Sequence, residues 1–314
     1  MTADLTAQAP AIETEDLVKA YQGSETKSVD GLSLSVPRGK VYCLLGRNGA
    51  GKTTTIRMLT TLLPPTSGRA EVLGVPVAET KRLRPLIGVA LQEVALDLWM
   101  SPVEQIRMSL AMAGWSKADR RRREHELVEQ FGIGSYRDKK VGQLSGGMRR
   151  RVDVALAVSH NPQLLFLDEP SSGLDVEGKE EVWRTVELLR SQGRTVLLTT
   201  HDMDEAVTLS DEIGIMKDGR LVASGATREF TEGHGFSVEV LADSAIPDDA
   251  VRALAASGQP FERTGPAALA LAAPSSDAAA LAKLTAALEQ CGLGEARVAV
   301  RSSSLRDIFL EATA

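Results

Sequence analysis

Short apolar runs alternate with segments of helical periodicity through the first two thirds of the chain. The runs at residues 41–45, 164–167 and 195–200 are too short to be helices, and each is predicted to form a strand buried on both faces. After each run, apolar residues recur three or four positions apart, as on the buried face of a helix. Strands that alternate with helices predict an α/β fold built on a mostly parallel sheet.

The helix after the first strand has clear limits in the sequence. It is expected to begin near Lys52 and to continue through Leu63, because Pro64 and Pro65 forbid a further turn. Residues 92–161 contain mostly helical periods with charged faces, and we expect a helical insert there.

Two further regions have an extended pattern. Residues 12–36 predict an antiparallel β region at the start of the chain. Asp218 and Gly219 favour a tight hairpin turn between residues 213–216 and 221–223.

The last part of the chain has another order of elements, which fits a ferredoxin-like β-α-β-β-α-β domain and a final helix. In chain order the segments are residues 236–241, 248–256, 261–264, 267–272, 277–290, 297–301 and 305–312. We therefore expect two domains, residues 1–231 and a small α+β domain of residues 232–314.

Composition narrows the classes of protein that fit. The 314 residues carry a net charge of −6, which argues against a surface built wholly for nucleic acid. Cys43 and Cys291 are too few for a disulfide framework, and a reducing compartment is expected. The longest apolar run, residues 267–273, is far shorter than the roughly 18 apolar residues of a membrane span.

Residues 46–53 have the sequence Gly-Arg-Asn-Gly-Ala-Gly-Lys-Thr, directly after a predicted strand and before a predicted helix. Glycines there let successive backbone N–H groups point at phosphate oxygens, and the start of the helix adds its positive end. Lys52 would contact the β- and γ-phosphates, and Thr53 would offer a hydroxyl to Mg²⁺. The pattern predicts a nucleotide-binding loop rather than a simple glycine-rich turn.

Two carboxylates follow the predicted strand at residues 164–167. Asp168 suits Mg²⁺ and Glu169 suits a water molecule, because open α/β sheets bind ligands at the carboxyl ends of their strands. An Asp-Glu-Pro sequence alone is more often an ordinary loop, but the upstream phosphate loop reverses that preference. His201 follows another strand and is a candidate to face a γ-phosphate, whereas a lone histidine there is more often a bystander.

A second glycine pair lies farther along. Ser145, Gly146 and Gly147 precede the basic residues 149–151, and this segment either binds an anion at a helix start or is simply a capped helix. Residues 120–123, four consecutive arginines, are interpreted as a solvated helix face rather than a nucleic-acid site.

In this order the motifs resemble the ATP-binding subunits of ABC transporters, which implies a P-loop NTPase fold of the ABC ATPase type. The resemblance covers about residues 12–225 and rests on the phosphate loop, Gln92, the Leu-Ser-Gly-Gly and Leu-Asp-Glu-Pro segments and His201. Residues 62–68, the Ser-Gly-Gly-Met-Arg-Arg-Arg segment and the ending Ser-Leu-Arg-Asp-Ile-Phe-Leu resemble the exporter branch typified by daunorubicin resistance ATPases.

The resemblance implies a hydrolytic site for ATP and Mg²⁺. Glu169 would polarise the attacking water, His201 would sense the γ-phosphate, and Lys52 would complete the catalytic set. Tyr21 would stack on adenine, and Gln92 would link the Mg²⁺ site to the membrane partner. The nucleotide contacts would come from Tyr21, Gly46, Arg47, Asn48, Gly49, Ala50, Gly51, Lys52, Thr53, Thr54, Gln92, Ser145, Gly146, Gly147 and Asp175, and the metal contacts from Thr53, Gln92 and Asp168.

The resemblance also implies partners. Ser145, Gly146 and Gly147 of one copy would close over ATP bound to a second copy, with Asp175 at that interface, so a homodimer is expected. A separate ABC-2-type membrane permease would turn the cycle into export of drugs, antibiotics or other hydrophobic molecules. The chain would then be peripheral, at the cytoplasmic face of the membrane, with residues 232–314 regulating or stabilising the dimer and no nucleic acid bound.

One residue departs from the family, and one alternative function stays open. Met148 stands where the signature commonly has Gln, and a thioether cannot reproduce the hydrogen bonds of an amide. The alternative is a soluble ABC ATPase that acts on ribosomes or DNA. Only one motif set occurs, however, and no sustained heptads separate Gly46 from Asp168. A small-molecule kinase would leave Gln92 and the Leu-Ser-Gly-Gly segment unexplained.

Overall fold

The computed structural model describes residues 9–232, 236–242, 244–256, 261–273, 285–286, 288–293, 296–302, 305 and 309. The chain divides into two compact units, Met1–Gly225 and Ala226–Ala314. This division falls just before α8 (Thr227–Glu232), whereas the boundary expected from the sequence lies inside that helix.

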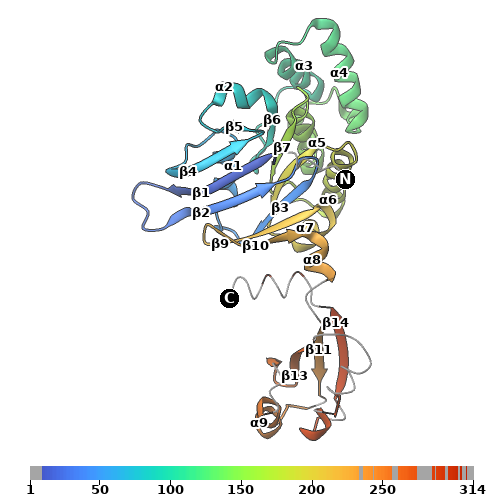
Figure 1. Ribbon diagram of the computed structural model, residues 1–314. Helices are drawn as coiled ribbons and strands as arrows, with labels where there is room; N and C mark the ends of the chain where they lie inside the picture. The colour runs from blue at the N-terminus through green and yellow to red at the C-terminus, as the bar shows by residue number, and fades with distance from the viewer. Residues whose placement is uncertain are drawn as a thin grey trace, which may run out of the picture. The chain divides into compact units, whose positions relative to one another are not determined.

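The first unit is centred on a six-stranded sheet with the order β10-β9-β3-β8-β7-β6 (Figure 1). Its strands are β3 (Val41–Gly46), β6 (Ile87–Ala90), β7 (Leu164–Asp168), β8 (Thr195–Thr200), β9 (Glu212–Lys217) and β10 (Arg220–Ala226). Neighbouring strands from β9 to β6 run parallel. Every residue of β3, β7 and β8 is buried, which confirms the predicted mostly parallel sheet.

A second, antiparallel sheet has the order β2-β1-β4-β5. Its strands are β1 (Ile12–Ala20), β2 (Lys27–Val36), β4 (Ser67–Val72) and β5 (Val75–Pro76). Ile12 and Leu34 from this sheet share one apolar cluster with Leu44, Phe166 and Leu197 from the parallel sheet. Burial of this shared cluster joins the two sheets into one core.

Three longer helices belong to the predicted helical insert, and η2 (Gly134–Tyr136) and η3 (Val141–Gln143) lie between the second and the third of them. They are α3 (Pro102–Met112), α4 (Lys117–Gln130) and α5 (Gly146–Ala157). Ser101 caps α3 in a capping box with Glu104, and Ser116 caps α4 by accepting a hydrogen bond from Asp119 N–H.

The remaining helices of this unit are α1 (Lys52–Leu59), α2 (Thr80–Leu83), the short η1 (Arg84–Leu86), α6 (Val176–Ser191) and α7 (Met203–Leu209). Of these, α1, α6 and α7 follow strands of the parallel sheet, and α2 and η1 lie between β5 and β6. The buried residues of α6 include Val182, Val186 and Leu189, the apolar positions at helical spacing.

One prediction about these elements is wrong, and one strand of the parallel sheet is not predicted from the sequence. The helix α1 ends at Leu59 rather than continuing through Leu63, because Thr61 takes a left-handed conformation with φ of 64°. The N–H groups of Leu62 and Leu63 both donate to the carbonyl of Arg57 and close the helix end. The sequence pattern does not predict β6, since this strand has only four residues and lies at the edge of the sheet.

The second unit contains an antiparallel sheet with the order β12-β13-β11-β14. Its elements are β11 (Phe236–Leu241), α9 (Asp248–Ala256), β12 (Phe261–Gly265), β13 (Ala268–Ala273) and β14 (Arg297–Ser302). Val240, Leu254, Leu269 and Leu288 belong to its own apolar cluster. Residues 277–284 of the expected second helix and most of the expected final helix at 305–312 lie outside the described residues.

Candidate active site

The predicted phosphate loop joins the end of β3 to the start of α1. Gly51 immediately precedes α1 with φ of 102°, and a Cβ atom there would lie 2.3 Å from the carbonyl oxygen of Ser28. A Cβ on Gly46 would lie 2.7 Å from the carbonyl oxygen of Met216. Both contacts are with backbone that cannot move aside, so only glycine fits at either position.

The turn between β9 and β10 is hydrogen-bonded to this loop. Asp218 and Gly219 have φ of 48° and 78°, as the predicted hairpin turn requires. Gly219 N–H donates to Ala50 O at 3.0 Å, and Asp30 N–H donates to Gly219 O at 2.9 Å. The loop is therefore hydrogen-bonded to a turn that is itself hydrogen-bonded to β2.

A pocket of about 310 Å³ lies over the loop. The residues that line it are Ser28, Asn48, Gly49, Ala50, Gly51, Lys52, Thr53, Thr54, Gln92 and Glu169. The start of α1 lies among these residues, and the positive end of a helix favours an anion. Nine of these residues come from the predicted site, and Ser28, at the start of β2, belongs to no recognisable motif.

Lys52 is buried at the centre of the site. Its ammonium donates to the carbonyls of Gly46, at 2.7 Å, and Arg47, at 3.3 Å, and lies 3.1 Å from Oε1 of Glu169. Gly46 and Arg47 thus hold the lysine rather than line the pocket. The ammonium is placed to exchange the Glu169 contact for a contact with an incoming anion.

Asp168 is fully buried at the end of β7. Its Oδ1 accepts hydrogen bonds from Thr199 Oγ1 at 2.6 Å and from Thr53 Oγ1 at 3.2 Å. Its Oδ2 is buried and has no hydrogen-bond partner in the described part of the chain. A buried carboxylate oxygen without a partner beside a threonine hydroxyl is a donor set that suits Mg²⁺, which prefers oxygen ligands.

Glu169 connects the lysine to His201. It has φ of 46°, a strained conformation for a residue with a side chain, and its N–H is held by the carbonyl and hydroxyl of Thr199. Its Oε2 lies 2.8 Å from Nδ1 of His201, whose side chain is about half exposed. The strained backbone aims a carboxylate between a cation and an imidazole, an arrangement that can accept a proton from water.

Arg150 is a buried residue beside the site, and the sequence pattern does not single it out. Its buried guanidinium donates to Asp168 O at 2.9 Å, to Pro170 O at 3.1 Å, to Leu91 O and to Asp153 Oδ2 at 2.9 Å. Burial raises the pKa of Asp153 to about 6, and its ion pair with Arg150 partly offsets that rise. The basic run at residues 149–151 was the available signal, but spacing does not show which arginine turns inward.

Ser145 and Asp175 both cap helices. Ser145 Oγ accepts a hydrogen bond from Met148 N–H at 3.2 Å, and Asp175 Oδ1 accepts one from Gly178 N–H at 2.9 Å. A Cβ on Gly147 would lie 3.0 Å from the Cα of Gly178, so the starts of α5 and α6 pack closely. The cap uses the backbone of Met148, and its thioether is not needed for it.

Five other predicted contacts do not line the pocket over the phosphate loop: Tyr21, Ser145, Gly146, Gly147 and Asp175. Gly146 lines a second hollow, together with Gln92, Glu169 and Arg150. Tyr21 is 41% exposed and does not line the first pocket, and the ammonium of Lys19 lies 5.6 Å from its ring centre. The contact of Tyr21 with adenine therefore stays a prediction.

Comparisons with known proteins give the site a family. The family model described as ABC transporter matches residues 29–172. The chain is 47% identical over 229 residues to the daunorubicin/doxorubicin resistance ATP-binding protein DrrA of Streptomyces peucetius. The aligned residues cover 73% of this chain and 69% of that protein. It is 38% identical over 307 residues to the daunorubicin resistance ATP-binding protein DrrA3 of Streptomyces coeruleorubidus, with 96% of each chain covered.

Solved structures agree with these relatives. The ATP-binding cassette MJ0796, in a dimeric post-hydrolysis state bound to ADP and Pi, matches with a TM-score of 0.63 at 25% identity, over 69% of this chain and 99% of that chain. The structure of cbiO1 from Clostridium perfringens, part of an ABC transporter complex, matches with a TM-score of 0.65 at 28% identity, over 71% and 90% of the two chains. The protein is thus an ATPase that belongs to the ATP-binding subunits of ABC transporters, in the branch of the drug-resistance ATP-binding proteins.

Proposed function

We propose that this subunit drives the efflux of drugs, antibiotics or related hydrophobic molecules through a separate ABC-2-type membrane permease. The names of the relatives, which describe resistance to daunorubicin and doxorubicin, support the substrate class. In the described part of the chain, no helix is long and apolar enough to span a bilayer. The subunit would bind the permease at the cytoplasmic face of the membrane.

Exposed apolar side chains on the helical insert support a protein partner. Trp99 and Met112 are 84% and 81% exposed, and Leu98 and Met108 are also exposed. Large apolar side chains that are left in water favour contact with another protein. They belong to α3 and the segment before it, the same insert that carries Gln92 at its start.

Binding of the nucleotide would use the residues over the start of α1. Backbone N–H groups of residues 48–54 and the ammonium of Lys52 would hold the phosphates. Thr53 and Asp168 would hold Mg²⁺, together with Gln92, and the ion would neutralise phosphate charge when bound. Phosphate oxygens would compete with Glu169 for Lys52, which would release the carboxylate to meet a water molecule.

Hydrolysis would rest on Glu169 as the general base, and its place between Lys52 and His201 is the observation that carries this proposal. The carboxylate is buried and its backbone is fixed by Thr199, so it is already positioned to orient water. The Nδ1 atom of His201 would hold the Oε2 atom in place. The imidazole would also respond to charge on the γ-phosphate.

A second copy of the chain would complete the site. Ser145 is exposed at the start of α5 and Gly146 is partly exposed, whereas Gly147 is buried against the start of α6. The start of a helix favours an anion. We infer that Ser145, Gly146 and Gly147 of one copy contact the ATP held by the other, with Asp175 at the same interface. Since Met148 contributes its backbone to the cap, its replacement of the usual Gln leaves this contact intact.

The substitution Glu169→Gln tests the proposal. It keeps the size of the side chain but removes the base, so ATP turnover should fall roughly 10²- to 10⁴-fold while ATP binding persists and dimers accumulate. Steady-state phosphate release and light scattering with ATP and Mg²⁺ would measure both effects. Glu129→Gln, on the exposed face of α4, is the matched control. Undiminished turnover in Glu169→Gln would refute the assignment.

A reconstituted system tests the substrate class. The subunit and its permease in vesicles should pump daunorubicin or a similar amphiphile only with ATP, and Glu169→Gln should stop the transport. ATP turnover stimulated by ribosomes or DNA, and not by the permease, would contradict the proposal.

A further inference from the structure

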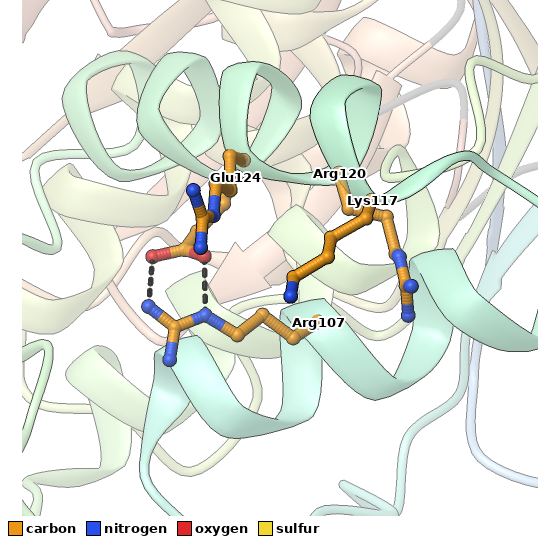
Figure 2. A pocket seen from close by; sticks show the side chains of 5 residues that line it. Arg107, Lys117, Arg120 and Glu124 are labelled. Carbon is orange, nitrogen blue, oxygen red and sulfur yellow. Dashed lines mark hydrogen bonds and ion pairs between the residues drawn. The ribbon is translucent and has the colours of Figure 1, made fainter.

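The helical insert contains a strongly basic pocket that the ATPase chemistry does not use. It has a volume of about 370 Å³ and is lined by Arg107 of α3 and by Lys117, Arg120, Arg121 and Glu124 of α4. The four α4 residues are spaced i, i+3, i+4 and i+7, so they share one face of that helix. Figure 2 shows side chains from α4 reaching toward α3, with Arg107 reaching back from α3 to Glu124.

The single carboxylate of this pocket is already occupied. Glu124 is buried, and both of its oxygens accept hydrogen bonds from Arg107, at 2.5 and 2.9 Å. Oε1 also accepts a hydrogen bond from Arg137 at 3.0 Å. Glu124 therefore serves two guanidinium groups and is not available to neutralise the other cations.

Three cations of the pocket have no acidic partner within the described ranges. Lys117, Arg120 and Arg121 form no ion pair there, and the Nε atom of Arg120 is buried without a hydrogen-bond partner. The other two arginines of the run are satisfied, since Arg122 pairs with Asp119 and Arg123 donates to the carbonyls of Val158 and Ser159. The four arginines thus divide into two that are used by the fold and two that face the pocket.

The position of these cations on α4 increases their energetic cost. They lie in the first turns of a 14-residue helix, where the helix dipole is already positive and favours anions. Lys117 and Arg121, spaced i and i+4, also repel each other. A bound anion would relieve both effects.

We propose that this pocket binds a compact phosphate group, either the headgroup of an anionic lipid or a soluble phosphorylated compound. Two guanidinium forks and an ammonium match the oxygens of phosphate, to which arginine binds in a bidentate way. Each of the five residues that line the pocket carries a charged group, whereas a site for a hydrophobic drug is lined mainly by apolar and aromatic side chains. The volume suits one phosphate ester, and the proposal is independent of the transport function.

Affinity for inorganic pyrophosphate, measured by calorimetry without Mg²⁺, tests the proposal. All variants carry Lys52→Ala, so that the phosphate loop contributes little to the signal. Arg120→Gln/Arg121→Gln should weaken binding roughly tenfold or more, because charge-assisted hydrogen bonds are lost. Arg122→Gln, a change of the same chemistry in the same run, should alter affinity less than twofold.

Cosedimentation with vesicles distinguishes the two sources of phosphate. Binding to phosphatidylcholine vesicles that contain phosphatidic acid, lost in the double variant but kept in Arg122→Gln, would support a lipid headgroup. Loss of pyrophosphate binding alone would support a soluble compound. Circular dichroism checks folding, and if the double variant unfolds, Lys117→Gln and Arg121→Gln are tested singly.

The proposal is overturned if the double variant and Arg122→Gln bind both probes equally well. It is also overturned if neither probe binds to the protein with the intact pocket. Tighter binding of single-stranded RNA than of either probe, lost in the double variant, would equally contradict it, because the ligand would then be a polynucleotide.

Discussion

Replacement of Arg150 by Met should lower the stability of the fold and remove hydrogen bonds that hold the backbone at the end of β7, where Asp168 and Glu169 lie. The guanidinium is 4% exposed, and it satisfies the backbone carbonyls of Leu91, Asp168 and Pro170 as well as Asp153. Breaking a buried ion pair by removing one partner typically costs about 3–5 kcal/mol. We expect Arg150→Met to lower the free energy of unfolding by about that amount near pH 7, because a buried carboxylate is left without its cation.

A double-mutant cycle separates the two parts of this loss. In Arg150→Met/Asp153→Asn, no uncompensated charge remains, so roughly half of the loss should be recovered while the three carbonyls stay unsatisfied. Urea denaturation of the full chain measures each variant, and Arg149→Met, on the neighbouring half-buried residue, is the matched control. The reasoning is refuted if the double variant is no more stable than Arg150→Met.

Three other substitutions test the ion pair of Arg150, the phosphate loop and the hydrogen bonds of Thr199. Asp153→Asn should flatten the pH dependence of stability. The pKa of Asp153 in the folded protein, about 6, lies above the ordinary value of 3.8 for an aspartate. Stability that is present below pH 4 in the parent, worth about 3 kcal/mol, is therefore lost as pH rises to 6, and urea denaturation at a series of pH values measures this loss. Gly51→Ala should abolish nucleotide binding in a fluorescent ATP-analogue titration, because the new Cβ would strike the carbonyl oxygen of Ser28; unchanged affinity would contradict the loop geometry. Thr199→Val should cost about 1.5–3 kcal/mol in urea denaturation and slow ATP turnover, because Asp168 and Glu169 N–H both lose its hydroxyl.

The parallel sheet and its phosphate loop could be predicted because their signals are local. Residues 41–45 form an apolar run that predicts a buried strand. The glycines that follow it and the position of Lys52 among them match the phosphate-loop pattern. The end of α1 could not be predicted in the same way. Leu63 is apolar because it packs on the core, which imitates helical periodicity after the helix has ended.

Residues that act across long distances in the chain escaped the sequence analysis. Ser28 lines the pocket because β2 lies beside the phosphate loop, and Arg150 reaches the end of β7 because its side chain packs inward. Neither position is marked by a motif or by a periodic pattern in the sequence. The sequence predicts a solvated face for the run of four arginines, but Arg120 and Arg121 line a pocket with Arg107 of α3, because the fold decides which helix lies beside α4. Capping residues such as Ser145 can be predicted more readily from the sequence, since a cap joins residues that are only three positions apart.

The hydrogen bond from Gly219 to Ala50 has a consequence for the order of events during biosynthesis. The ribosome must complete nearly all of the first unit before the β9–β10 turn emerges to brace the glycine loop. Nascent fragments that stop before Asp218 would contain the entire loop but lack the hydrogen bond from Gly219 to Ala50. We therefore expect the unfinished chain to bind nucleotide more weakly than the finished unit.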